Sequence, residues 1–341
     1  MINFPMANWR PPFKTTCIAT SSVGQIATSF DAGDTWTLRT SGLASPTSAK
    51  NRLPYRCPGT GTILVPGTNA SGYATVSRSV NRGVTWAPIA TTFVGEFEAV
   101  ISNGAGSWLA VGLSGAVWRS TNDGATWVDV SANLTSTETS KHLYALARAT
   151  TGRIVAAGIY GFYYTDNFGD TWTQNTGWAT PTGLTQFVAI PYGVNSVLLG
   201  SEWIKIRQTT GVGTPYLLYS YAATSYAISA IAIANGTGFA LAAVNSAVGS
   251  GYPQLIYSAD LVTWSDVSAR IPGGITASCW AIAQTGANTW LLGFTGGKIA
   301  RSVDGALTFS DISAASPFGI SIILGLMAFT LPNDVIDLIA N

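Results

Sequence analysis

Short apolar runs joined by glycine-containing turns recur along most of this chain of 341 residues. Three such pairs of runs begin at Ser107, Gly152 and Thr289 and read SWLAVGLSGAVWRS, GRIVAAGIYGFYYT and TWLLGFTGGKIARS. Two short apolar runs around a tight turn predict a β-hairpin rather than a helix. Because a further run precedes each hairpin and a short one follows it, the repeating unit is predicted to hold four antiparallel strands.

One octapeptide ends the hairpin in most of these units. Four full copies are SFDAGDTW (29–36), SVNRGVTW (79–86), STNDGATW (120–127) and TDNFGDTW (165–172), and two altered copies are SADLVTW (258–264) and SVDGALTF (302–309). We predict a decayed copy from Ser220 to Tyr226, which have the same separation as Ser258 and Trp264. The seven copies then begin 38 to 55 residues apart, a period typical of propeller blades or solenoids.

Each position of the octapeptide has an expected structural role. Aspartate or asparagine in third place can accept hydrogen bonds from backbone N–H groups of the turn, and glycine in fifth place allows a positive φ. The closing tryptophan can pack against a neighbouring repeat. We therefore predict structural roles for the third-place residues Asp31, Asn81, Asn122, Asn167, Asp260 and Asp304 and for the tryptophans Trp36, Trp86, Trp127, Trp172 and Trp264.

Seven units of four strands predict an all-β fold, a seven-bladed β-propeller that forms one domain over residues 1–341. The expected blades are 15–41, 52–90, 95–131, 141–176, 184–227, 228–268 and 276–313, followed by a closing strand or tail over 314–341. Residues from Gly319 to Thr330 are predicted to supply the innermost strand of the first blade. The alternative is that Pro5 to Phe13 supply it.

On these octapeptides the chain resembles the Asp-box (BNR) propellers, a family that includes sialidases and many non-catalytic members. The resemblance covers about residues 15 to 313. It implies that each octapeptide joins the third and fourth strands of its blade at the periphery, as scaffold. The richness in Gly, Ala, Ser and Thr further resembles the propellers of bacteriophage tails and other virions.

Charge and composition exclude several classes of function. Lys and Arg number 17 against 16 Asp and Glu, which is too balanced for a protein that binds nucleic acid through its phosphates. A single histidine, His142, and the absence of CxxC and HExxH argue against a Cys/His metal site, so no metal and no cofactor is expected. Cys17, Cys57 and Cys279 are odd in number and far apart, which favours buried free thiols.

No targeting or membrane segment is visible in the sequence. The start, MINFPMANWRPPFK, lacks the features of a secretory signal. The longest apolar run, Phe318 to Pro332, is shorter than the roughly 18 to 20 residues that span a bilayer and is interpreted as a buried strand. We expect a virion protein assembled in the host cytoplasm, or a cytoplasmic protein.

The segment from Tyr55 to Pro58, YRCP, resembles the motif that opens the first blade of sialidases. That resemblance implies that Arg56 holds the carboxylate of a sialic acid. It also implies an acid/base aspartate between the second and third strands of the same blade, where the segment from Thr68 to Tyr73 has no carboxylate. We therefore expect no catalytic residues and no enzymatic activity, with a sialidase-like glycoside hydrolase as the alternative.

Two segments are longer than the other expected turns: Ser201 to Pro215 and Asn245 to Pro253. Long connections on a regular scaffold are common places for binding residues. We expect a cell-surface glycan or a neighbouring virion or structural protein as partner, and a propeller that assembles a protein complex is a further alternative. The candidate ligand-binding residues are Arg56, Tyr73, Tyr160, Glu202, Trp203, Lys205, Arg207 and Tyr252.

Overall fold

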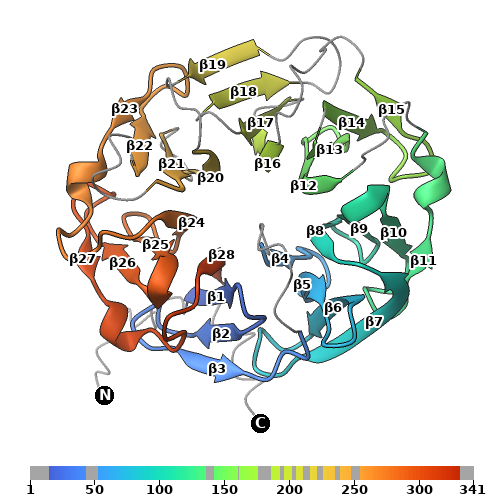
Figure 1. The fold of residues 1–341 in the computed structure, drawn as a ribbon, viewed down its shortest axis with the longest axis horizontal. Helices are drawn as coiled ribbons and strands as arrows, with labels where there is room; N and C mark the ends of the chain where they lie inside the picture. Colours follow the sequence, from blue (N-terminus) through green and yellow to red (C-terminus); the bar gives the residue numbers. More distant parts are fainter. Residues whose placement is uncertain are drawn as a thin grey trace, which may run out of the picture.

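Seven four-stranded antiparallel sheets stand around a central axis in the computed structural model of the chain (Figure 1). The structure describes residues 15–43, 53–135, 142–159, 161–175, 186–192, 196–201, 205–209, 216–220, 226–234, 239–246 and 254–330. These residues contain no α-helix, and so no helix that is long and apolar enough to cross a membrane. The predicted all-β, seven-bladed propeller is confirmed.

Each blade places its strands in order from the axis to the rim. The innermost strands are β28 (Ile323–Thr330), β4 (Tyr55–Arg56), β8 (Phe97–Ser102), β12 (Leu143–Arg148), β16 (Gln186–Tyr192), β20 (Ile228–Ile233) and β24 (Cys279–Gln284). The second strands are β1 (Thr15–Ser21), β5 (Ile63–Thr68), β9 (Trp108–Gly112), β13 (Ile154–Gly158), β17 (Ser196–Ser201), β21 (Ala240–Val244) and β25 (Trp290–Phe294).

The outer half of each blade is built in the same way. The third strands are β2 (Ile26–Ser29), β6 (Tyr73–Ser79), β10 (Val117–Ser120), β14 (Gly161–Thr165), β18 (Lys205–Thr209), β22 (Leu255–Ser258) and β26 (Ile299–Ser302). The outermost strands are β3 (Thr37–Arg39), β7 (Ala87–Val94), β11 (Val128–Asp129), β15 (Thr173–Gln174), β19 (Tyr216–Ser220), β23 (Ser265–Asp266) and β27 (Ser310–Asp311).

The ring closes through β28, which pairs antiparallel with β1 from the other end of the chain. Thr15 lies opposite Thr330 and Ser21 opposite Ile323, so the two strands pair over the whole length of β1. Figure 1 shows the red β28 between the central axis and the blue β1. The predicted closure by the apolar segment before Pro332 is confirmed; Pro5 to Phe13 lie outside the described residues.

The hydrophobic core lies between neighbouring blades. Strand β25 is buried along its whole length, because blades pack against both of its faces. Its Trp290 and Leu292 contribute to one cluster with Leu241 and Leu255 of the preceding blade. Leu291, on the other face of the strand, belongs to the cluster shared with the first blade. Cys17, Cys57 and Cys279 are free and buried in these layers, as predicted.

The fifth blade corrects one prediction. In it, the third strand β18 ends at Thr209 and the fourth strand β19 begins at Tyr216, so the connection between them is 210–215, which lies outside the described residues. Ser220 is the last residue of β19, and Tyr226 lies outside that strand. The prediction of a copy at Ser220 to Tyr226 is therefore wrong. The matching segment is TTGVGTPY, which has kept a glycine in fifth place but has lost the Asp or Asn and the tryptophan.

Antiparallel order gives the ring two different faces. The octapeptides and the connections between first and second strands lie on one of them, which we call the turn face. The connections between second and third strands, and those between blades, lie on the other, which we call the loop face. The candidate residues that the structure describes can be placed relative to these two faces and to the channel that joins them.

Candidate functional site

The first octapeptide is held together by its own side chains. The Ser29 hydroxyl donates to Asp31 Oδ1 over 2.7 Å and accepts from the Gly33 N–H over 2.9 Å. Asp31 Oδ1 also accepts from the Thr35 N–H over 2.9 Å. The indole of Trp36 donates to the Gly33 carbonyl over 3.0 Å. These bonds engage both the carboxylate and the indole within the turn.

The other octapeptides repeat this arrangement. In each one the third-place side chain accepts from the backbone N–H of the threonine that precedes the closing aromatic residue; the acceptors are Asn81, Asn122, Asn167, Asp260 and Asp304. Trp86 and Trp127 donate to the glycine carbonyl as Trp36 does. Trp172 is buried at the rim of its blade, and Trp264 packs against the core between the fifth and sixth blades.

The four full octapeptides each contain two residues with positive φ rather than one. Fourth-place residues such as Ala32 and Phe168 have φ of 59° and 54°, followed by the glycines Gly33 and Gly169 at 96° and 86°. Glycine adopts this region at little cost, whereas the residue before it is strained. The hydrogen bonds of the turn stabilise that conformation.

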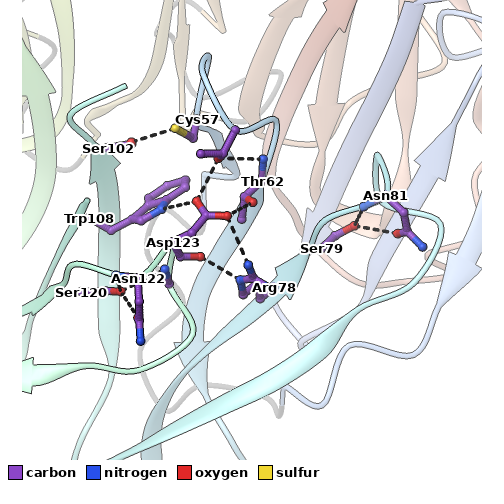
Figure 2. A network of polar contacts seen from close by, with 12 residues as sticks. Cys57, Thr62, Arg78, Ser79, Asn81, Ser102, Trp108, Ser120, Asn122 and Asp123 are labelled. Carbon is purple, nitrogen blue, oxygen red and sulfur yellow. Dashed lines mark hydrogen bonds and ion pairs between the residues drawn. The ribbon is translucent and has the colours of Figure 1, made fainter. Parts of the chain in front are cut away.

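Asp123, in fourth place of the third octapeptide, joins the second and third blades (Figure 2). It accepts from the hydroxyls of Thr60 (2.8 Å) and Thr62 and from the indole of Trp108 (3.3 Å). Arg78 donates over 3.2 Å to Oδ2, the oxygen that also accepts from Thr62. Burial disfavours the charged form, but these hydrogen bonds outweigh it and lower the pKa of Asp123. The carboxylate is thus a structural link between blades.

Arginines that directly precede an octapeptide bind the next blade. Arg78 pairs with Asp123 of the third blade, and Arg119 pairs with Asp170 of the fourth. Arg301 of the seventh blade pairs with Asp34 of the first, which completes the series around the ring. The arginine before an octapeptide therefore makes the same kind of ion pair, with an aspartate of the following blade, in all three cases. These guanidinium groups lie at the turn face rather than in the channel.

A channel cavity of about 220 Å³ runs along the axis. It is lined by the innermost strand of every blade, and most of these strands have a bulge near their first residue. The residue after the bulge is small in four of them, namely Ala99, Ala145, Ala230 and Ala281. Small side chains at one level of the ring keep the channel open.

Almost all of the cavity lining is aliphatic. Its polar members are Tyr55, Tyr144, Arg148 and Ser229, and none of the described lining residues is a carboxylate. The single hydrogen of the Ser229 hydroxyl is shared between the carbonyls of Cys279 (2.8 Å) and Ala243 (3.2 Å), so this group serves the fold. The chemistry that the lining offers is apolar contact and, at one end, a guanidinium group.

The structure does not bring Arg56 and Tyr73 together. Arg56 pairs with Ile63 at the start of β5, whereas Tyr73 follows the turn after the other end of that strand. The two positions are about 17 Å apart along β5. The Arg56 guanidinium lies 4.8 Å from the centre of the Phe329 ring, near the turn face, and burial lowers its pKa. Tyr73 is at the loop face, with 40% of its surface exposed.

The expected loop from Ser201 to Pro215 is wrong, because Lys205–Thr209 is strand β18. Its charged residues conceal the strand in the sequence, yet Ile206 belongs to the core. Arg207 is 7% exposed, donates to the Ser201 hydroxyl over 3.0 Å, and has a pKa lowered by burial. Lys205 is the first residue of β18, at the loop face. Four candidates lie outside the described residues: Tyr160, Glu202, Trp203 and Tyr252.

The sequence reasoning missed the two polar residues at the turn-face end of the channel, Tyr55 and Arg148. Arg148 ends β12 and belongs to no motif, whereas Tyr55 begins the YRCP segment, in which Arg56 alone is a predicted ligand-binding residue. Residues line the channel only because seven separate blades meet around the axis, so their position there is not visible in any one segment of the sequence.

Comparison with known proteins identifies the fold alone. No family model and no curated protein matches the chain. Among solved structures, a GH74 xyloglucanase from Xanthomonas campestris is 16% identical in sequence, with a TM-score of 0.64. The alignment covers 86% of this chain but only 51% of the xyloglucanase chain. The structure of YCF48 bound to D1 peptide is 15% identical with a TM-score of 0.58, covering 86% of this chain and 94% of its own. A protein from Lactobacillus plantarum is 11% identical with a TM-score of 0.61, covering 93% and 99%.

Proposed function

We propose that this protein is a non-enzymatic member of the Asp-box propellers that binds a partner through its loop face. One observation carries the proposal: the axial channel is aliphatic, while the aspartates of the octapeptides are engaged in turns at the opposite face. Glycoside hydrolysis uses two carboxyl groups, or a tyrosine nucleophile with acidic partners, close to one another. Glu96 and Glu98, on or beside innermost strand β8, are buried at 2% and 0% exposure.

The loop face offers the better binding surface. Tyr73 of β6 is exposed there. It lies opposite Val94 of the neighbouring strand β7, which is 72% exposed. An exposed tyrosine with apolar neighbours can stack on a sugar ring or contact a protein. The partner we propose is a cell-surface glycan or a neighbouring virion protein, and the location we propose is the tail or another part of a virion.

A hydrolysis screen and a glycan array together test this function. Purified protein is tested against fluorogenic sialosides, neutral glycosides and xyloglucan oligosaccharides, and then on the array. We expect no turnover, and array binding that Tyr73→Ala weakens while Val84→Ala, at the turn face, does not. Turnover that Arg56→Ala abolishes would instead establish the sialidase-like alternative. Co-sedimentation with intact virus particles tests the proposed location.

A protein-binding assembly factor is the second candidate. It is favoured by the aliphatic channel, which suits apolar side chains better than hydroxyl-rich sugars, and by the likeness to a propeller solved with a bound peptide. Cross-linking in the producing cell followed by mass spectrometry would identify such a partner. A stable protein partner, together with no binding on the glycan array, would favour the assembly factor over the glycan-binding protein.

A further inference from the structure

The channel ends at an arginine that takes part in none of the ion pairs found among the described residues. Arg148, the last residue of β12, is half-buried and lines the cavity. Its Nε is buried and has no hydrogen-bond partner. The four ion pairs among the described residues use Arg78, Arg119, Arg153 and Arg301, each with an aspartate. A desolvated donor without an acceptor is costly, so this site favours an anion.

Neighbouring groups hold the guanidinium at the channel end. A Cβ atom added to Gly104 would lie 4.0 Å from its Nη1, and one added to Gly152 would lie 3.7 Å from its Nη2, so the guanidinium packs beside the turns that contain these glycines. Tyr55 lies close by, with its ring edge-on to Trp108 at 5.9 Å. Burial raises the pKa of Tyr55 even though the charge of Arg148 opposes this, so its hydroxyl remains a hydrogen-bond donor at neutral pH.

The rest of the channel requires an apolar occupant. Ala99, Ala230, Ile282 and Leu324 come from four different blades, and each lines the cavity. Because the hydroxyl of Ser229 is already bonded to two carbonyls, the middle of the channel has little to offer a polar ligand. An occupant that suits both parts has one anionic end and one hydrocarbon body.

The size of the cavity limits that occupant. An apolar cavity of about 150 Å³ accommodates benzene, so about 220 Å³ has room for roughly nine non-hydrogen atoms. A guanidinium group binds a carboxylate through two parallel hydrogen bonds. We propose that the channel binds a medium-chain monocarboxylic acid, with its carboxylate on Arg148 and the Tyr55 hydroxyl and its chain among the innermost strands. This site is separate from the loop face and does not depend on the function proposed there.

Titration calorimetry with octanoate tests the proposal on the full chain. Octan-1-ol and octylammonium serve as ligands with the same chain but no negative charge. The variants are Arg148→Gln, Ala230→Leu to fill the channel, and Arg119→Gln as a matched control at the turn face. Thermal melting of each variant establishes that it is folded.

We expect octanoate to bind at least tenfold more tightly than either other ligand. Arg148→Gln should remove this preference, Ala230→Leu should weaken binding of all three ligands, and Arg119→Gln should change neither. The proposal is overturned if octanoate does not bind at millimolar concentration, if octylammonium binds equally well, or if Arg148→Gln leaves binding unchanged. If Ala230→Leu fails to fold, the comparison of Arg148→Gln with Arg119→Gln still shows whether octanoate binding depends on Arg148.

Discussion

Arg301 of the last blade forms an ion pair with Asp34 in the octapeptide of the first blade. The same position in the third blade, Arg119, pairs with Asp170 of the fourth. The seam at which the ring closes thus carries the same link between blades as an ordinary boundary. Strand β28 and this ion pair join the first and last blades at different radii of the ring.

The seam pair is expected to contribute little on its own. Asp34 is 55% exposed, and exposed ion pairs typically stabilise a fold by about 0.2–1 kcal/mol. A double-mutant cycle with Arg301→Ala and Asp34→Ala, followed by urea unfolding, measures the coupling. We expect a value in this range that falls as salt rises. A coupling above about 2 kcal/mol would contradict the assignment as a surface pair.

Asp123 should matter far more than an exposed aspartate. Asp123→Ala leaves the hydroxyls of Thr60 and Thr62 and the indole of Trp108 without their acceptor between two blades. We expect a loss of about 2–4 kcal/mol of unfolding free energy. Asp166→Ala, which breaks only an exposed pair with Arg153, is the control and should cost less than about 1 kcal/mol. Equal losses in urea unfolding would refute the role of Asp123 as a link.

The octapeptide aspartates predict acid sensitivity. Hydrogen bonds from Thr308 hold the pKa of Asp304 well below its ordinary value of 3.8, and Asp260 is similarly affected by Thr263. Since the folded pKa is lower than the unfolded one, this stabilisation is complete above about pH 4 and is lost as the pH falls towards the folded pKa. Asp304→Asn should flatten the fall of the melting temperature between pH 5 and 2. The chain itself supplies the precedent, since Asn81 makes the same turn bonds. An unchanged profile would show that other groups govern acid unfolding.

Gly83 tests how tightly the turns pack against the preceding blade. It has φ of 83°, and a Cβ there would lie 2.6 Å from Ile18 Cδ1 and 3.0 Å from Thr28 Oγ1. Gly72 has a similar φ of 80° but no atom within 4 Å of that position. Gly72→Ala should therefore cost about 1 kcal/mol for backbone strain alone, and Gly83→Ala about 2–4 kcal/mol. If both substitutions lower unfolding free energy equally, the close packing is not decisive.

Cys17 offers a direct test of ring closure, because it lies opposite Ala328 of β28. Opposed residues on antiparallel strands have Cα atoms about 4.5–5.5 Å apart, which suits a disulfide. Ala328→Cys should form one when the protein is refolded under oxidising conditions and raise the melting temperature until dithiothreitol is added. Oxidation of the folded protein should be slow, since burial raises the pKa of Cys17 to about 12. Ala328→Ser is the control. A failure to cross-link during refolding would contradict the observed register.

The ring was predictable because its signals are local. A turn such as Ser29 to Trp36 makes its defining bonds within eight residues, so the sequence contains all of its partners. The fifth blade was misassigned because its turn has lost those side chains and because Lys205 and Arg207 make β18 resemble a loop. The channel was invisible for a different reason. Arg148 and Tyr55 are 93 residues apart in the sequence and meet only when separate blades close around the axis.

Pairing of β28 with β1 has a consequence for synthesis. The partner of β1 is made only after about 300 further residues, which at 5–20 residues per second takes roughly 15 to 60 seconds. During that time the first blade has three of its four strands, and one long edge of β1 is free to pair with other chains. Each of the other blades can complete its own sheet as it emerges. The blades therefore form one after another during synthesis, and the ring closes only when β28 has been made. A chain truncated before β28 keeps the exposed edge of β1, which can pair with strands of other chains.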